Sequence, residues 1–330
     1  MTNDIQWART DARHAALSVL PAVAIIVTVD VKAGVLAAIG LLPVCLVGIA
    51  PQRRQRLLVG IVGLLFAAGV VVGSVLIQVH ALAVIGIFVL CFLSASLAAK
   101  KAAGLIVTAI VMPAVAIGMS YDSISDGLGL ALFFALGSIW ATLTSLLRPI
   151  DSAAATDAAP LLSKAEARRY GILLGLAAAT GVSIALIFDF SSRGWTAAAV
   201  LLVMRPVADM VRLRGVARAL ATISGVVAAT LVLRLGLGAP ATAGLVAVVF
   251  IATIATRTSK WYLASAGTAV LILLAILYGT TDADSIHDTS WTRVIENVIG
   301  AAIALFYGLL VPSLLAKRSH APAPTAQDAL

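Results

Sequence analysis

The sequence predicts an all-α fold, a polytopic bundle of about 12 transmembrane helices arranged as two parallel six-helix repeats. Of the 330 residues, 61% are hydrophobic and only 12% are charged, which excludes an ordinary soluble domain. Twelve apolar stretches follow one another, each close to the roughly 20 residues that a helix needs to cross a bilayer. The pattern of basic loops, glycines and prolines then recurs about 160 residues later.

The first repeat, residues 1–147, contains six predicted spans. They are 14–29, 33–50, 57–79, 81–98, 102–119 and 127–147. A cytoplasmic linker follows over residues 148–168. In it, Ser163 and Glu166 have the spacing of a capping box, so the next helix is predicted to begin before its apolar part.

The second repeat, residues 169–315, contains the other six predicted spans. They are 169–188, 194–211, 216–236, 239–256, 261–279 and 294–315. The Pro- and Ala-rich residues 316–330 are predicted to be a disordered cytoplasmic tail.

Most of the 23 lysine and arginine residues fall in alternate connections, which predicts the orientation. Positive side chains are retained on the cytoplasmic side, so both termini are expected in the cytoplasm and the bundle in the cell inner membrane. The net charge of +8 is then a topology signal that favours membrane lipid, and not nucleic acid, as a partner. The positions expected on the outer side are Lys32, Arg193, Arg234 and Arg293.

The internal repeat depends on matched positions. Pro43 corresponds to Pro206, and the group Arg56, Gly60, Gly63 corresponds to the group Arg218, Thr222, Gly225. Because each unit has an even number of spans, the two copies are predicted to share one orientation. The alternative is that apolar segments and basic loops align by chance in any polytopic protein.

In residues 194–206, Trp195 stands at the start of a predicted helix and Pro206 falls late in it. Residues 214–225 then contain an R-x-x-G-T-x-x-G type of element, with Ala221 in place of the first glycine. These two stretches resemble the fusaric acid resistance protein-like (FUSC) family of aromatic acid exporters. The resemblance implies efflux of small organic anions, often aromatic carboxylates, driven by a gradient without ATP. The rival fold is the major facilitator superfamily, but its loop signature needs an aspartate near Gln52, and none is present.

Arg205 is the strongest substrate-binding candidate. A charge at membrane depth costs ~2.5 to 3.5 kcal/mol unless something compensates it, and a guanidinium can hold a carboxylate by two parallel hydrogen bonds. Pro206 beside it, and Pro43 in the equivalent place, would interrupt their helices as at a midplane binding site. Asp209 is the candidate for proton coupling. Alternatively, Arg205 extends to the inner interface and Asp209 is only its partner.

The remaining candidates are an aromatic ring and a cytoplasmic basic motif. Trp195 either stacks on an aromatic substrate or anchors a span end at the interface. The motif residues either lock the cytoplasmic ends or serve topology and close helix packing. They are Arg56, Arg214, Arg218, Gly63 and Gly225.

We therefore expect a transporter that exports small organic anions, and neither a catalytic motif nor a metal or cofactor site is predicted. The alternatives are an anion channel, a major-facilitator-type transporter, or a non-transporting membrane subunit of an envelope complex. A homo-oligomer or an efflux-complex partner is compatible with each of these.

Overall fold

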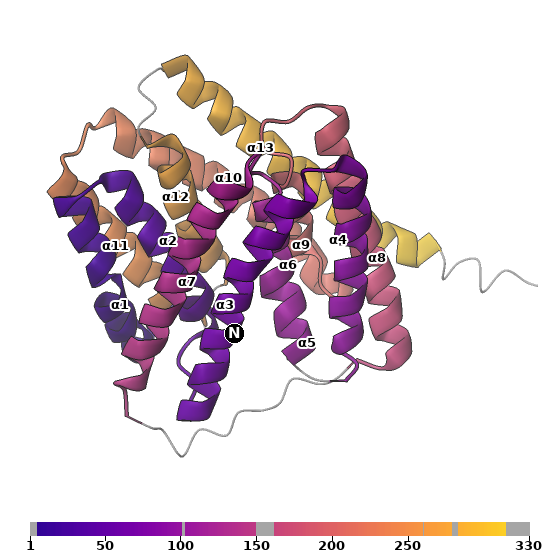
Figure 1. Cartoon of the computed structure of the whole chain (residues 1–330), viewed down its shortest axis with the longest axis horizontal. Coiled ribbons are helices and arrows are strands. Elements are labelled where there is room, and N and C mark those ends of the chain that lie inside the picture. The colour runs from indigo at the N-terminus through magenta and orange to yellow at the C-terminus, as the bar shows by residue number, and fades with distance from the viewer. Residues whose placement is uncertain (1–4, 101–102, 150–161, 260, 279–282, 315–330) are drawn as a thin grey trace, which may run out of the picture.

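The computed structural model describes residues 5–100, 103–149, 162–259, 261–278 and 283–314. Every regular element in these ranges is a helix (Figure 1). The all-α prediction is thus confirmed. The predicted tail and most of the linker lie outside the described residues.

The first half forms helices close to the predicted spans. They are α1 (Arg9–Thr28), α2 (Val31–Val47), α3 (Arg53–Leu76), α4 (His80–Leu97), α5 (Ala103–Ile106), the π-helical turn η1 (Val107–Val111), α6 (Met112–Gly118) and α7 (Ile124–Leu146). Because α5, η1 and α6 follow without a break, they form the single predicted helix over residues 102–119.

The second half begins with the predicted capping box. The Ser163 amide donates to Glu166 Oε2 (2.8 Å) and the Glu166 amide donates to Ser163 Oγ (3.2 Å), which starts α8 ahead of its apolar part. The helices that follow are α8 (Lys164–Ile187), α9 (Trp195–Val203), α10 (Ala208–Arg234), α11 (Ala239–Ala255), α12 (Trp261–Leu277), α13 (Ala283–Leu305) and the π-helical turn η2 (Phe306–Leu310).

Length and composition make this a multi-pass membrane protein. Seven of the described helices have at least 18 residues and are apolar enough to cross a bilayer, and four more apolar helices have 10–17 residues. Large apolar side chains also face outward, such as Leu132 (58% exposed), Leu220 (61%) and Val248 (64%). Lipid tails can cover such side chains, whereas in water they would form an unfavourable surface.

Each half packs against the other through its first and fourth helices. The fourth helix of the first half, α4, packs against α8, and the fourth helix of the second half, α11, packs against α1. Within the halves, α3 packs against α7 and α10 packs against α12 (Figure 1).

Helices α2 and α9 lie at the centre of the bundle. In α2, 11 of 17 residues are buried, and in α9, 8 of 9 residues are buried. Each of the two contacts a helix of the other half, since α2 packs against α12 and α9 packs against α6. Polar groups next to α9 therefore lie inside the protein.

Candidate functional site

A non-helical segment separates α9 from α10, although a single helix was predicted over residues 194–211. The helix ends at Val203, and the next one begins at Ala208. Pro206 has no amide hydrogen to donate, and its ring disfavours the helical conformation of Arg205 before it. The helix boundary prediction was therefore wrong at this point, because the proline ends the helix instead of bending it.

Arg205 lies in this break, with its guanidinium turned back onto the end of α9. Its Nη1 donates to the carbonyl oxygens of Leu201 (3.1 Å) and Met204 (2.6 Å). A positive charge at a helix C-terminus is favourable, so these contacts are those of a helix cap. Asp209 lies in the first turn of α10, but its side chain is outside the part of the chain that the structure describes.

Pro43 has different surroundings from Pro206. It is buried inside α2, which continues beyond it to Val47. Of the two prolines that match in the sequence, Pro43 thus lies inside a continuous helix, whereas Pro206 lies between two helices.

A group of buried polar residues lies on α13 and faces α9. We call Arg293, Glu296 and Asn297 the α13 cluster; they are 8%, 0% and 3% exposed. Arg293 Nη1 donates to Glu296 Oε2 (2.8 Å), and its Nη2 donates to Ser192 Oγ (2.5 Å). The guanidinium lies 4.9 Å from the ring centroid of Trp195, within the range of a cation–π interaction.

Arg218 of α10 joins the α13 cluster from the other side. Its Nε donates to Asn297 Oδ1 (3.0 Å), and Asn297 Nδ2 donates to the Arg293 carbonyl oxygen (2.8 Å). Trp195, Arg218, Arg293 and Asn297 line a cavity of about 20 Å³ together with apolar residues of α12, including Ala269. This cavity is large enough for a single water molecule.

Several polar atoms near the α13 cluster have no hydrogen-bond partner among the described residues. They are Glu296 Oε1, Arg293 Nε, Ser290 Oγ and Thr196 Oγ1. Buried polar groups are nearly always hydrogen-bonded, and leaving one unpaired costs ~1 to 3 kcal/mol. Three of these atoms belong to neighbouring turns of α13, and Thr196 follows Trp195, which contacts Arg293; together they indicate a place where water or a polar ligand binds.

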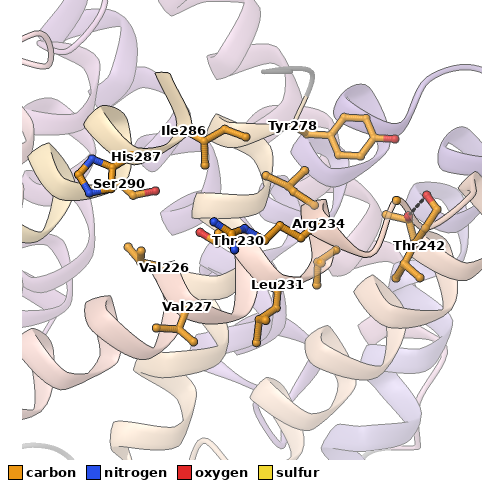
Figure 2. A pocket seen from close by; sticks show the side chains of 14 residues that line it. Val226, Val227, Thr230, Leu231, Arg234, Thr242, Tyr278, Ile286, His287 and Ser290 are labelled. Carbon is orange, nitrogen blue, oxygen red and sulfur yellow. Dashed lines mark hydrogen bonds between the residues drawn. The ribbon is translucent and has the colours of Figure 1, made fainter. Parts of the chain in front are cut away.

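A larger cavity lies beside the α13 cluster, between α10, the first turn of α11, Tyr278 after α12, and α13 (Figure 2). Its volume is about 860 Å³, and its lining includes Thr230 and Arg234 of α10, Tyr278, and His287 and Ser290 of α13. Ser290 lies one helical turn before Arg293, so both lie on one face of α13. Polar groups therefore continue along α13 from the large cavity to the buried pair.

The predicted basic motif lies at separate places in the fold. Arg56 is buried and donates to carbonyl oxygens after α7, at Arg148 (2.9 Å) and Pro149 (2.8 Å) among others. Gly63 packs against Ser138 of α7, and Gly225 packs against Ala269 of α12. The two glycines thus serve close helix approach.

Arg214 and Arg218 both lie on α10, which begins before them. Arg56 and Arg218, which match in the sequence, bind different partners. Arg56 binds the backbone after the end of α7, whereas Arg218 binds Asn297 within α13.

A known protein-family model matches the part of the chain that contains Arg218 and the α13 cluster. The family model described as fusaric acid resistance protein-like matches residues 164–307. Residues 164–307 are thus similar to a FUSC-like domain. Neither a curated protein nor a solved structure matches the chain. The FUSC-like domain and the apolar helices together make this a membrane protein of transporter type.

The FUSC-like domain contains the break at Arg205, the α13 cluster and Arg218. The sequence analysis found Arg205, Trp195 and Arg218 but did not select Glu296 or Asn297, and it placed Arg293 in an outer loop. The signal was available. Positions 293, 296 and 297 have the i, i+3, i+4 spacing of one helix face, and they lead into the apolar stretch that follows.

Proposed function

We propose that this protein transports small organic anions, with aromatic carboxylates as the expected class, and exports them without ATP. Arg218 and Arg293 support the proposal, because they reach one small cavity from α10 and α13 within apolar helices. Placing ionisable groups inside a membrane protein is costly, and they usually mark a substrate or ion path. Two guanidinium groups favour an anion, and Trp195 beside them suits an aromatic ring.

The large cavity supports a path to this site. At about 860 Å³ it falls within the usual range of small-molecule pockets, and Arg234 and His287 add positive or polar character at its lining. In this proposal the substrate leaves the guanidinium groups past Ser290 and exits between α10, the end of α12 and α13, because Arg234 and Arg293 are expected on the outer side.

The test is uptake of radiolabelled benzoate by purified protein in liposomes, with protein-free liposomes as the blank. We expect saturable uptake by the wild type. Arg218→Gln should reduce it about 10- to 100-fold, because a hydrogen bond to a charged group contributes ~1.5 to 3 kcal/mol. Arg212→Gln is the matched control, since Arg212 is an exposed arginine of the same helix.

Uptake by Arg218→Lys should fall between that of the wild type and that of Arg218→Gln, because lysine keeps the charge but lacks the planar donor group. Thermal unfolding must show that each variant is folded. Absence of uptake of any aromatic or aliphatic carboxylate by folded wild-type protein would contradict the proposal. Arg205, Pro206, Pro43 and Asp209 remain further candidates for binding and coupling.

We also infer that the two halves are copies related by an axis along the membrane normal, with both termini cytoplasmic in the inner membrane. The exchange of partners supports this, since α4 packs against the first helix of the second half and α11 against the first helix of the first. A two-fold axis produces such an exchange. Fusing a reporter that is active only in the cytoplasm to each terminus tests the orientation.

A further inference from the structure

Glu296 is a carboxylate in the interior of a membrane protein, with one oxygen bound and the other not. It is 0% exposed; Oε2 accepts from Arg293 Nη1 at 2.8 Å, and Oε1 has no partner among the described residues. An ionised carboxylate in such a place depends almost wholly on its one arginine. Arg293 in turn has Glu296 as its carboxylate partner, and its Nε is free among the same residues.

The groups that face this pair from the surrounding elements carry no second acid among the described residues. Arg218 of α10 lies beyond Asn297, and Tyr121, between α6 and α7, interacts electrostatically with Arg293. The helix α9 contributes the Trp195 ring, and α12 lines the adjoining cavity with apolar side chains. Glu296 is therefore the one carboxylate of the α13 cluster, and the groups described around it include no second acid.

A substrate carboxylate and an ionised Glu296 cannot share Arg293 without strong repulsion. Two carboxylates within a few ångströms in a dry site do not both stay ionised, and one of them takes up a proton. On the side of Ser290, Arg293 Nε and Ser290 Oγ both lack a partner among the described residues and can bind a substrate carboxylate. Binding there displaces Glu296 from the guanidinium.

We propose that Glu296 is a place-holder for the substrate anion on Arg293, and that it takes up one proton each time a substrate carboxylate replaces it. This rests on the proposed transport of organic anions. In the empty site, Arg293 is paired with ionised Glu296. In the loaded site, Arg293 is paired with the substrate, and a proton from the solution forms an O–H bond on the Glu296 carboxyl.

Release reverses these steps on the other side of the membrane. The substrate leaves Arg293, Glu296 gives its proton to the solution on that side, and the pair forms again. One anion and one proton cross together, so no net charge moves. Export by this cycle then requires an outward gradient of the anion that exceeds any inward gradient of the proton.

The experiment measures proton movement and charge movement separately, with full-length protein in liposomes and benzoate as the probe. Because benzoic acid itself crosses a bilayer, initial rates are used and the rate in protein-free liposomes is subtracted. For the wild type we expect one proton per benzoate in this protein-dependent flux, as read by a pH dye inside the liposomes. The protein-dependent rate should rise when the outer solution is made more acidic and should not respond to an imposed membrane potential.

For Glu296→Gln, which keeps the shape but cannot ionise, we expect benzoate to move without a proton. Its protein-dependent initial rate should become insensitive to the pH difference and should respond to an imposed potential, because each benzoate then carries one uncompensated charge. Asp284→Asn is the matched control, because Asp284 is an exposed acid of the same helix, and it should behave as the wild type.

The outcomes separate the two proposals. If folded wild-type protein carries no carboxylate, both fail. If the wild type carries benzoate as a current without protons, or if Glu296→Gln keeps the dependence on the pH difference, the role of Glu296 is overturned while anion transport stands. If Glu296→Gln does not fold, the number of protons that the wild type moves per benzoate decides the role of Glu296 by itself.

Discussion

Arg257 and Asp11 form an ion pair that joins the end of α11 to the first turn of α1. Arg257 Nη2 lies 2.9 Å from Asp11 Oδ2, and the two side chains are only 18% and 11% exposed. Arg257 Nη1 also donates to the carbonyl oxygen of Val47 (3.2 Å), where α2 ends. One guanidinium thus connects both halves of the protein at the ends of three helices.

Asp11→Asn should destabilise the protein by about 2 to 3 kcal/mol. The substitution leaves the Arg257 charge without its carboxylate, and breaking a fully buried pair costs ~3 to 5 kcal/mol, which the partial exposure reduces. The measurement is thermal unfolding in detergent. Asp122→Asn is the control: Asp122 pairs with Arg193 at 3.3 Å but is 79% exposed, so a loss below ~1 kcal/mol is expected. Equal losses of stability in Asp11→Asn and Asp122→Asn would contradict the conclusion that the Arg257–Asp11 pair stabilises the fold.

Arg56→Lys should destabilise the protein although the charge is kept. The guanidinium donates to five carbonyl oxygens, those of Ala50, Pro51, Ser145, Arg148 and Pro149. An ammonium has three donors and no planar fork, so at least two of these bonds are lost, at ~1.5 to 3 kcal/mol for each strong one.

The measurement is again thermal unfolding, with Arg54→Lys as the control because Arg54 is an exposed arginine of the same helix turn. A neutral effect of Arg56→Lys would mean that water replaces the lost bonds. Arg56 would then serve mainly as a topology signal, the alternative that the sequence allows.

The sequence predicted the helices better than the contacts between them. Apolar length alone gave the helical bundle, and the Ser163 capping box was predicted in detail, because both depend on residues that are neighbours in the chain. The end of α9 was missed because Pro206 was treated as an interruption in a longer helix. In fact α9 ends at Val203 and Arg205 caps it.

The candidate site was predicted only in part for a related reason. Trp195 and Arg218 were selected from their own surroundings in the sequence. The link between them passes through α13, about 80 residues beyond Arg218, and depends on which face of α13 is turned to α9. No local pattern specifies that orientation, since tertiary packing sets it. A polar triplet at the start of an apolar span is nevertheless a usable signal, and Glu296 was its deepest member.

Gly137→Ala should destabilise the contact between α2 and α7. A Cβ at Gly137 would lie 2.4 Å from the Gly40 carbonyl carbon, which is backbone and cannot move without shifting a helix. Overpacking of this kind costs ~1 to 3 kcal/mol. Gly129→Ala is a control on the same helix, because nothing lies within 4 Å of its added Cβ.

Gly129→Ala should be neutral or stabilising by up to ~1 kcal/mol, since alanine has the higher helix propensity. Thermal unfolding of the two variants side by side provides the measurement. If both lose stability alike, the close approach of α2 and α7 at Gly40 is wrong.

A disulfide between positions 95 and 171 should form and join the two halves. A Cβ at Gly171 of α8 would lie 3.1 Å from the Cβ of Ala95 in α4, close to the ~3.5 to 4.5 Å of a disulfide, so a small adjustment brings the pair into range. The native thiols Cys45 and Cys91 are both free and buried, and both are first replaced by alanine.

A protease site inserted in the linker then lets the halves separate on a gel unless they are bridged. We expect the cleaved, oxidised Ala95→Cys, Gly171→Cys protein to migrate as one band and to separate after reduction. Ala95→Cys with Gly244→Cys should separate under both conditions, because a Cβ at Gly244 of α11, in the second half, has nothing within 4 Å. Separation of the first pair before reduction would show that α4 and α8 are not neighbours. The exchange of helices between the halves, on which the proposed two-fold axis rests, would fail with it.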